Sequence, residues 1–352
     1  MYTSVLKKLL IWVSQILSSK KEQKSIPEKK DMVEIKEETQ IEVNEMDDKD
    51  FYNQSSANRL GWTPSWFGAE HFDDDLVEGI KRFQQDHDLT ADGLCGPSTY
   101  RRAWTDRQAN ISDYKPKEAG HLIGQKYIVH NGKFLPIEWD KVKLWDEAGG
   151  LVMRPGTYYD NSGKEDREPT QFTYHWDVCL SAESCARVLN KKGSSVHFCL
   201  DNDGTIYQIL DTQHGAWHCG KRYGNRNGIG IEISNAYYTK YQSWYEKNGF
   251  GPRPVVAKGE NVIHGVPMKE HLGFYPVQME ALKALTKAIH LGLGIPLECP
   301  VDENGEPIMG VDERCNTGEF SGFNNHYNYT RRKIDCANID MINLLAEVKE
   351  SL

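Results

Sequence analysis

Three separated segments of the chain carry residue types that can bind a metal ion or act in hydrolysis. They are the β-prone run 172–176, the apolar run 227–233 and the polar segment 326–336. Catalytic zinc is held by three protein ligands, usually imidazole nitrogens and carboxylate oxygens, and keeps a fourth position for water. The residues that fit such a set are His175, His326 and Asp335. We therefore predict a zinc-dependent hydrolytic centre built from these segments.

Amide hydrolysis also needs a base that takes a proton from water and a positive charge that stabilises the oxyanion. Glu232 lies inside an apolar run, where an unpaired carboxylate would be costly, and it is the predicted base. Its alternative is an outward-facing charge on an alternating strand, with Ile231 and Ile233 facing inward. Lys333 is the predicted cation. The alternative is that Lys333 belongs to a basic run exposed to solvent, because it follows two arginines.

The order and spacing of these segments resemble the type-2 family of zinc N-acetylmuramoyl-L-alanine amidases, whose fold is shared with peptidoglycan recognition proteins and many phage endolysins. The runs 196–208 and 216–220 resemble that family too, and the likeness spans roughly residues 172–340. The resemblance implies cleavage of the amide between N-acetylmuramic acid and the L-alanine of the stem peptide. It also implies zinc as the cofactor and catalytic roles for Glu232 and Lys333.

Some details depart from the family pattern. The glycine often found before the second histidine is missing before His326, and the distance from His326 to Lys333 is one residue short. Some relatives use a cysteine as the third ligand, so Cys336 remains an alternative, although the Lys-x-Asp spacing of the family favours Asp335. Val196 stands where some phage relatives carry a catalytic tyrosine, which favours the glutamate-using branch.

Further polar and aromatic residues lie in segments that resemble the family. The predicted substrate contacts are His218, Trp217 and Asn225. His218 could equally orient a metal ligand, and His197 is predicted to be structural.

Composition limits the class of protein. With 352 residues and 39% hydrophobic content, the chain can bury a sizeable core and form two domains. A formal net charge of -9 argues against nucleic-acid binding, which normally uses a basic face. Eight cysteines without a CxxC pair fit neither a disulfide scaffold nor a zinc finger. Cys179 and Cys185 could form a disulfide, as in some animal peptidoglycan recognition proteins, or remain buried thiols.

The N-terminal third has three predicted parts. Residues 1–18 carry an apolar stripe at helical spacing that is too short to span a bilayer, so we expect an amphipathic or signal-like helix that could contact a membrane surface. Residues 19–50 are rich in lysine and glutamate and predict a disordered tether. Residues 51–105 predict two helices joined by a turn rich in glycine and proline, and the run from Phe83 to Thr99 resembles the small three-helix peptidoglycan-binding domain. The alternative is a simple helical hairpin.

The remainder is predicted to be a linker, residues 106–120, and an amidase domain, residues 121–352. Asn131-Gly132 predicts a tight β-hairpin, and His130 beside it is expected at the surface. Strands alternate with helices at 181–190 and 276–291, which predicts an α/β fold with a mixed sheet flanked by helices. Residues 298–323 are expected to form a long surface loop.

Together these observations predict a modular, monomeric peptidoglycan hydrolase that acts at the bacterial cell wall, as a phage endolysin, virion-associated lysin or bacterial autolysin. Deleting residues 1–105 is expected to weaken action on intact wall and to leave the chemistry on soluble muropeptide intact. Two alternatives remain open. One is a non-catalytic recognition protein of the same fold, and the other is a zinc peptidase acting within the stem peptide.

Overall fold

The computed structural model describes residues 48–109 and 126–352. The helix predicted for residues 1–18, with its membrane contact, lies outside the described residues, as do most of the predicted tether and most of the predicted linker. Residues 48–50 and 106–109, which we had assigned to the tether and the linker, are helical. Within the described ranges, no helix combines the length and apolar character needed to cross a membrane.

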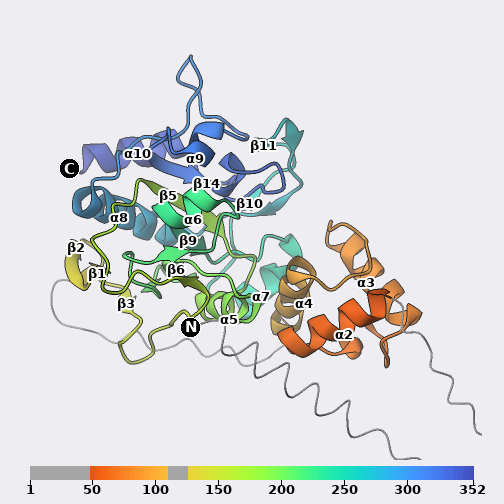
Figure 1. Ribbon diagram of the computed structural model, residues 1–352. Helices are drawn as coiled ribbons and strands as arrows, with labels where there is room; N and C mark the ends of the chain where they lie inside the picture. The colour runs from red at the N-terminus through yellow and green to blue at the C-terminus, as the bar shows by residue number, and fades with distance from the viewer. Residues whose placement is uncertain (1–47, 110–125) are drawn as a thin grey trace, which may run out of the picture. The chain divides into compact units, whose positions relative to one another are not determined.

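The first described segment is helical. It contains α2 (Asp48–Leu60), the 3-10 helix η1 (Pro64–Phe67), α3 (Asp74–Asp86) and α4 (Pro97–Ala109), drawn in orange in Figure 1. The Asp73 side chain accepts a hydrogen bond from the Leu76 amide and so caps the first turn of α3. Gln84 holds the turn that follows, because its side chain donates to Asp92 Oδ1 at 2.9 Å and accepts from the Gly93 amide at 2.9 Å. The two predicted helices are confirmed.

A six-stranded mixed sheet forms the centre of the second segment, and its strand order is β14-β5-β9-β6-β7-β3. The strands are β3 (Val142–Leu144), β5 (Gln171–Trp176), β6 (Phe198–Leu200), β7 (Ile206–Gln208), β9 (Gly228–Ile233) and β14 (Gly322–Asn325). The four strands β14, β5, β9 and β6 run parallel, whereas β7 is antiparallel to β6 and parallel to β3. The predicted fold class is confirmed.

Helices cover both faces of this sheet (Figure 1). Helices α8 (Pro276–Leu293) and α10 (Met341–Glu350) share a core with the alternate residues Tyr174 and Ile231 of the central strands. Helix α5 (Ala182–Lys192) belongs to a second cluster that contains Cys199 of β6. Since successive side chains of a strand point to opposite faces, Glu232 of β9 points away from the α8 side.

The helical segment and the sheet share this second cluster. Its buried members include Leu60, Leu76 and Tyr100 from the helical segment together with Leu189 of α5 and Cys199 of β6. The apolar surfaces of α2, α3 and α4 are therefore buried partly against the amidase part of the chain, and the described residues 48–109 do not form an isolated core.

Smaller elements complete the fold. The predicted hairpin is confirmed as β1 (Lys126–His130) and β2 (Lys133–Ile137), with positive φ angles of 49° at Asn131 and 70° at Gly132. His130 is buried, and its Nδ1 lies 2.9 Å from Thr212 Oγ1, so our expectation of a surface position was wrong. The remaining short elements are β4 (Tyr158–Tyr159), β8 (Gly215–Ala216), α6 (Arg222–Asn227), η2 (Thr239–Tyr241), α7 (Gln242–Lys247), β10 (Val255–Val256), β11 (Val262–Ile263), β12 (Val266–Pro267), β13 (His271–Leu272), α9 (Glu313–Thr317) and η3 (His326–Asn328).

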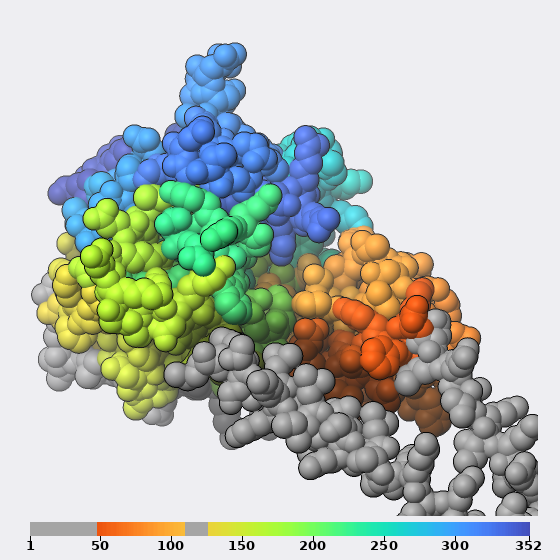
Figure 2. Space-filling view, viewed as in Figure 1, coloured from red at the N-terminus to blue at the C-terminus, as the bar shows by residue number. Residues whose placement is uncertain are grey.

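The polar segment 298–323 is a surface connection, as expected, but it is not structureless. A bridge between Val301 and Pro307 closes a narrow turn, and Figure 2 shows a narrow projection in the colour of residues near 300. Asp312 caps the short helix α9 by accepting a hydrogen bond from the Arg314 amide at 3.0 Å. The segment then enters β14, which leads directly to His326.

Candidate active site

The ends of parallel strands bring the separated sequence segments together. His175 on β5 lies directly beside Glu232 on β9 in the sheet register, and Asn325 on β14 lies beside Tyr174 on β5. His326 follows Asn325 and therefore reaches the same edge of the sheet. In open α/β sheets this edge, at the carboxyl ends of the strands, is where ligands bind.

His175, His326 and Asp335 converge at this edge, and each offers one ligand atom within 4.8 Å of the others. The two Nδ1 atoms lie 2.8 Å apart, and Asp335 Oδ2 lies 3.2 Å from His175 Nδ1 and 2.9 Å from His326 Nδ1. Tetrahedral zinc bonded to nitrogen or oxygen at its usual length would separate the ligand atoms by about 3.3 Å. This buried set of two imidazoles and one carboxylate therefore fits a zinc ion.

The electrostatics of the three residues suit metal binding. Burial lowers the pKa of both His175 and His326, so both imidazoles are held neutral, as a metal ligand must be. Burial alone would raise the pKa of Asp335, but the neighbouring His326 and the charge of Lys333 hold it well below its usual range. Asp335 is thus an ionised carboxylate.

Asp335 and Cys336 point to different environments. Asp335 faces the histidine pair, whereas Cys336 is fully buried in the apolar cluster shared with α8 and α10. The Tyr327 amide donates to the Asp335 carbonyl at 3.0 Å, which ties this loop to the residue after His326. The geometry therefore favours Asp335 as the third ligand.

Glu232 is buried, with 5% of its surface exposed, on the same face of the sheet as His175. Ile231 and Ile233 pack in the opposite core, so the outward-facing alternative for Glu232 is wrong. Its Oε1 lies 3.5 Å from Arg101 Nη2, and its Oε2 is buried without a hydrogen-bond partner among the described residues. This carboxylate oxygen is thus left unpaired by the described residues.

Lys333 lies in the loop that carries Asp335, and it is partly exposed. The imidazole of His264 donates through Nε2 to the Lys333 carbonyl at 2.8 Å, which fixes the backbone of this loop. The charge of Lys333 lowers the pKa of both His326 and Asp335, so Lys333 acts electrostatically on two of the candidate ligands.

His218 contacts a candidate ligand. Its Nδ1 lies 2.9 Å from His175 Nε2, the nitrogen that points away from the histidine pair. Burial and the neighbouring histidines hold the pKa of His218 well below its usual value, so this neutral ring accepts the His175 N–H. Its own Nε2 has no partner among the described residues. The geometry supports the alternative that His218 orients a ligand.

The other predicted contacts have structural partners. Asn225 Oδ1 accepts hydrogen bonds from the amides of His218 and Cys219, both at 3.0 Å, and so fixes the loop that carries His218. The ring of Trp217 packs edge-on against Tyr159, with centroids 5.6 Å apart. His197 accepts from the Gly230 amide through Nδ1 and donates to the His214 carbonyl through Nε2, as expected of a structural histidine. Cys179 and Cys185 are buried free thiols.

Sequence reasoning missed some charged residues near Glu232. Asp177 directly follows β5, two positions after His175, and this two-residue period could have identified it; burial and the charge of Glu232 raise its pKa to about 8. Lys192 ends α5, and burial together with the charges of Arg101 and Lys333 lowers its pKa to about 7. Nothing in the sequence associates Arg101 with the site, because it belongs to the helical segment.

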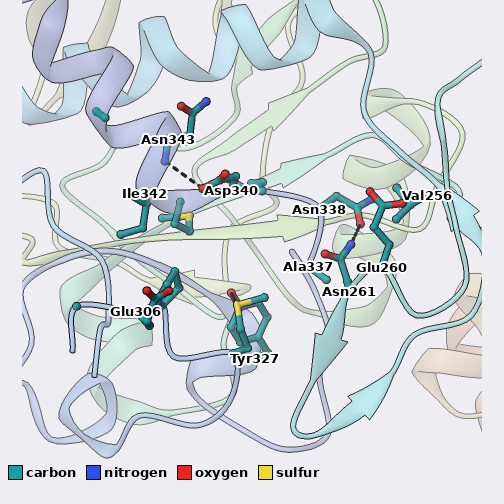
Figure 3. Close-up of a pocket in the computed structure, with 16 residues that line it drawn as sticks. Val256, Glu260, Asn261, Glu306, Tyr327, Ala337, Asn338, Asp340, Ile342 and Asn343 are labelled. Atoms are coloured by element: carbon teal, nitrogen blue, oxygen red, sulfur yellow. Dashed lines mark hydrogen bonds between the residues drawn. The ribbon is translucent and has the colours of Figure 1, made fainter. Parts of the chain in front are cut away.

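A cavity of about 800 Å³ lies beside the loop that follows the ligands. Tyr327 and Ala337 line it, but none of the three candidate ligands does. Figure 3 shows the Asn261 amide reaching Asn338, and Asp340 serving as the cap of α10. Three of its polar side chains, those of Glu260, Asn338 and Asp340, thus bind backbone groups around the cavity.

A mixed α/β sheet that presents a buried His-His-Asp set beside a buried glutamate defines a hydrolase with a candidate metal centre. A family model described as N-acetylmuramoyl-L-alanine amidase matches residues 165–301, and one described as a peptidoglycan binding domain matches residues 58–102. Residues 165–301 therefore form a domain of the N-acetylmuramoyl-L-alanine amidase type, and a peptidoglycan-binding domain precedes it in the chain. It is a peptidoglycan amidase of the cell-wall-degrading type.

Solved structures are also similar to this chain. An endolysin N-acetylmuramoyl-L-alanine amidase, LysCS, from Clostridium intestinale is 14% identical, with 59% of this chain and 95% of that chain covered and a TM-score of 0.33. A mutant endolysin from Bacillus subtilis is 18% identical, with 59% and 97% covered and a TM-score of 0.32. AmpDh3 from Pseudomonas aeruginosa, solved with anhydromuramic pentapeptide, is 17% identical, with 56% and 66% covered and a TM-score of 0.34. A comparison with curated protein sequences finds no match.

Proposed function

We propose that this chain hydrolyses the amide between N-acetylmuramic acid and the L-alanine of the stem peptide, with zinc held by His175, His326 and Asp335. The observation that carries the proposal is the convergence of these three buried ligand atoms beside Glu232, at one edge of the sheet. The match of residues 165–301 to the amidase family model supports the choice of bond.

The donor set suits zinc because it combines two neutral imidazoles with one ionised carboxylate. Zinc bound there would supply a water with a pKa of about 7 and would polarise the substrate carbonyl. His218 keeps the ring of His175 in place by accepting its outer N–H, which leaves Nδ1 of His175 free to bind the metal.

Glu232 is the proposed general base. Its unpartnered Oε2 accepts a proton from the attacking water, and the same carboxyl group then delivers a proton to the departing amine of L-alanine. This transfer is needed because an amine leaves an amide only once its nitrogen has been protonated.

Lys333 is the proposed electrostatic partner of the oxyanion. It lies on the loop of Asp335 and acts electrostatically on that carboxylate, and a cation there would stabilise the negative charge that the amide carbonyl gains. The backbone contact from His264 limits the movement of this loop.

The helical segment is the proposed wall-binding part, acting on peptidoglycan together with the amidase domain. The enzyme acts at the cell wall, and we propose that it does so as a monomer, in the manner of an endolysin or autolysin. A contact of residues 1–18 with a membrane surface remains part of this proposal.

The test is an analysis of the products released from purified cell wall. The proposal expects a new L-alanine amino terminus, loss of activity on chelation and recovery with added zinc. Glu232→Gln should lower kcat by roughly 100-fold or more, within the range expected for general acid–base catalysis, while the exposed Glu246→Gln should leave it unchanged. A different new amino terminus would indicate a peptidase, and wall binding without any release would indicate a recognition protein.

A further inference from the structure

The helical segment contributes a side chain to the amidase site. Arg101 on α4 lies with its Nη2 3.5 Å from Glu232 Oε1, and the two side chains are only 11% and 7% exposed. The residues are 131 positions apart in the chain. An ion pair that is this well shielded from solvent is much less screened than a surface pair.

Helix α4 is held at the amidase domain by several contacts around Arg101. Trp104 donates through Nε1 to Ser184 Oγ at 2.8 Å, and Thr105 donates to the Val178 carbonyl at 2.8 Å. Tyr100, the residue directly before Arg101, is buried in the apolar cluster shared with α5. The guanidinium group is therefore held against Glu232 by the fold itself.

The pair leaves one polar atom unused on each side. Arg101 Nε and Glu232 Oε2 are both buried and have no hydrogen-bond partner among the residues that the structure describes. Leaving charged, buried atoms unpaired is costly, so a molecule that pairs with them in the working enzyme would relieve the cost. One carboxylate oxygen of Glu232 is thus held by the cation, and the other remains free for the water that is to be deprotonated.

We infer that Arg101 is a positioning residue for the amidase reaction, supplied by the peptidoglycan-binding domain, that fixes the carboxylate of Glu232 for proton transfer. The inference rests on the proposed role of Glu232 as the base. The domain at residues 58–102 then has two tasks, because it binds the wall and also completes the catalytic site.

The same contact could instead inhibit the reaction, with Arg101 keeping Glu232 away from water until the peptidoglycan-binding domain moves. The shared apolar cluster argues against this, since moving α4 would expose the buried ring of Tyr100. The two ideas predict opposite changes in rate when Arg101 is replaced.

The experiment measures kcat and KM of the full chain on a soluble muropeptide. Arg101→Ala should lower kcat by roughly 10- to 100-fold, as is usual for residues that orient a catalytic group, and should change KM by less than about threefold. Arg101→Lys should recover part of kcat, and added guanidinium should partly rescue the alanine variant. Arg107 is an exposed residue on the same helix, so Arg107→Ala is the matched control. Its kcat and KM should equal those of the parent chain.

Should the alanine variant fail to fold, Arg101→Gln compared with Arg101→Lys isolates the effect of the charge, and circular dichroism with zinc content verifies each variant. In a Glu232→Gln background, Arg101→Ala should have little further effect, because both changes remove the same function. If Glu232→Gln stays active, the proposed function itself fails. If Glu232→Gln is inactive while Arg101→Ala is unchanged or faster, only the inference about Arg101 is overturned.

Discussion

The docking of helix α4 depends on the carboxylate of Asp106. Its Oδ2 lies 2.8 Å from His87 Nε2, and its Oδ1 lies 2.9 Å from Lys240 Nζ and 2.5 Å from the Tyr241 hydroxyl that donates to it. Burial alone would raise the pKa of Asp106, but hydrogen bonds from these partners outweigh it and lower the pKa from 3.8 to about 2. Replacing Asp106 by asparagine removes the charge while it keeps the shape.

The size of the effect follows from the two pKa values. A folded-state pKa of about 2, against 3.8 in the unfolded chain, contributes about 2 kcal/mol to the free energy of unfolding at pH 7. Because the folded pKa is depressed, this contribution is complete above the unfolded value and is lost as the pH falls. The contribution should be about 1 kcal/mol at pH 3 and well under about 1 kcal/mol at pH 2.

The assay is urea unfolding of the full chain, followed by tryptophan fluorescence and circular dichroism at pH 7 and pH 3. Asp106→Asn should lower the free energy of unfolding by about 2 kcal/mol at pH 7 and by roughly half as much at pH 3. The exposed Asp86→Asn on α3 is the matched control and should stay within about 0.5 kcal/mol of the parent chain. An Asp106→Asn effect that is absent at pH 7, or that grows as the pH falls, would refute the electrostatic reasoning.

Further predictions follow from the packing around the site. A Cβ atom on Gly230 would lie 2.8 Å from the His218 ring, so Gly230→Ala should displace His218. Zinc affinity, measured by metal-competition titration, should then fall by roughly tenfold. Unchanged zinc affinity would exclude a role of His218 in orienting His175. All eight cysteines are buried and free, and burial raises the pKa of the Cys179 and Cys185 thiols well above the usual value. A thiol reagent should therefore label the cysteines only after denaturation. Rapid labelling of the folded chain would contradict this burial. Removing residues 1–109 should lower the urea midpoint of the amidase part, because α5 would lose the apolar residues of the helical segment that pack against it. An unchanged midpoint would mean that the shared cluster adds no stability.

Much of the fold could be predicted because the signals are local. The Asn131-Gly132 turn requires positive φ angles at both positions, and the apolar face of α8 repeats with helical spacing. Glu232 was singled out because an unpaired carboxylate within an apolar run is costly, and the resemblance to the amidase family favoured its catalytic role. These features depend on a few neighbouring residues and on rules of backbone geometry.

What the sequence could not reveal depends on contacts between distant segments. Asp335 and Cys336 are neighbours in one loop, and only the path of that loop decides which side chain faces the histidines. His218 was given two roles, and only its distance to His175 distinguishes them. Arg101 gave no signal at all, since its partner Glu232 lies on another domain.

This docking also changes an expectation drawn from the sequence. Separate modules suggested that residues 1–105 could be deleted without harm to the chemistry on soluble muropeptide. The shared cluster and the Arg101 contact predict instead that such a deletion lowers both stability and kcat.

The central claim is that two imidazoles and the Asp335 carboxylate hold one zinc ion. X-ray absorption spectroscopy of the zinc-loaded full chain measures the bonded atoms directly. The structure predicts only nitrogen and oxygen neighbours at about 2.0–2.2 Å, with an imidazole signature that Asp335→Ala leaves intact while it weakens retention of the metal. A sulfur neighbour at about 2.3 Å, which would make Cys336 a ligand, or a purified chain that retains no zinc, would contradict it.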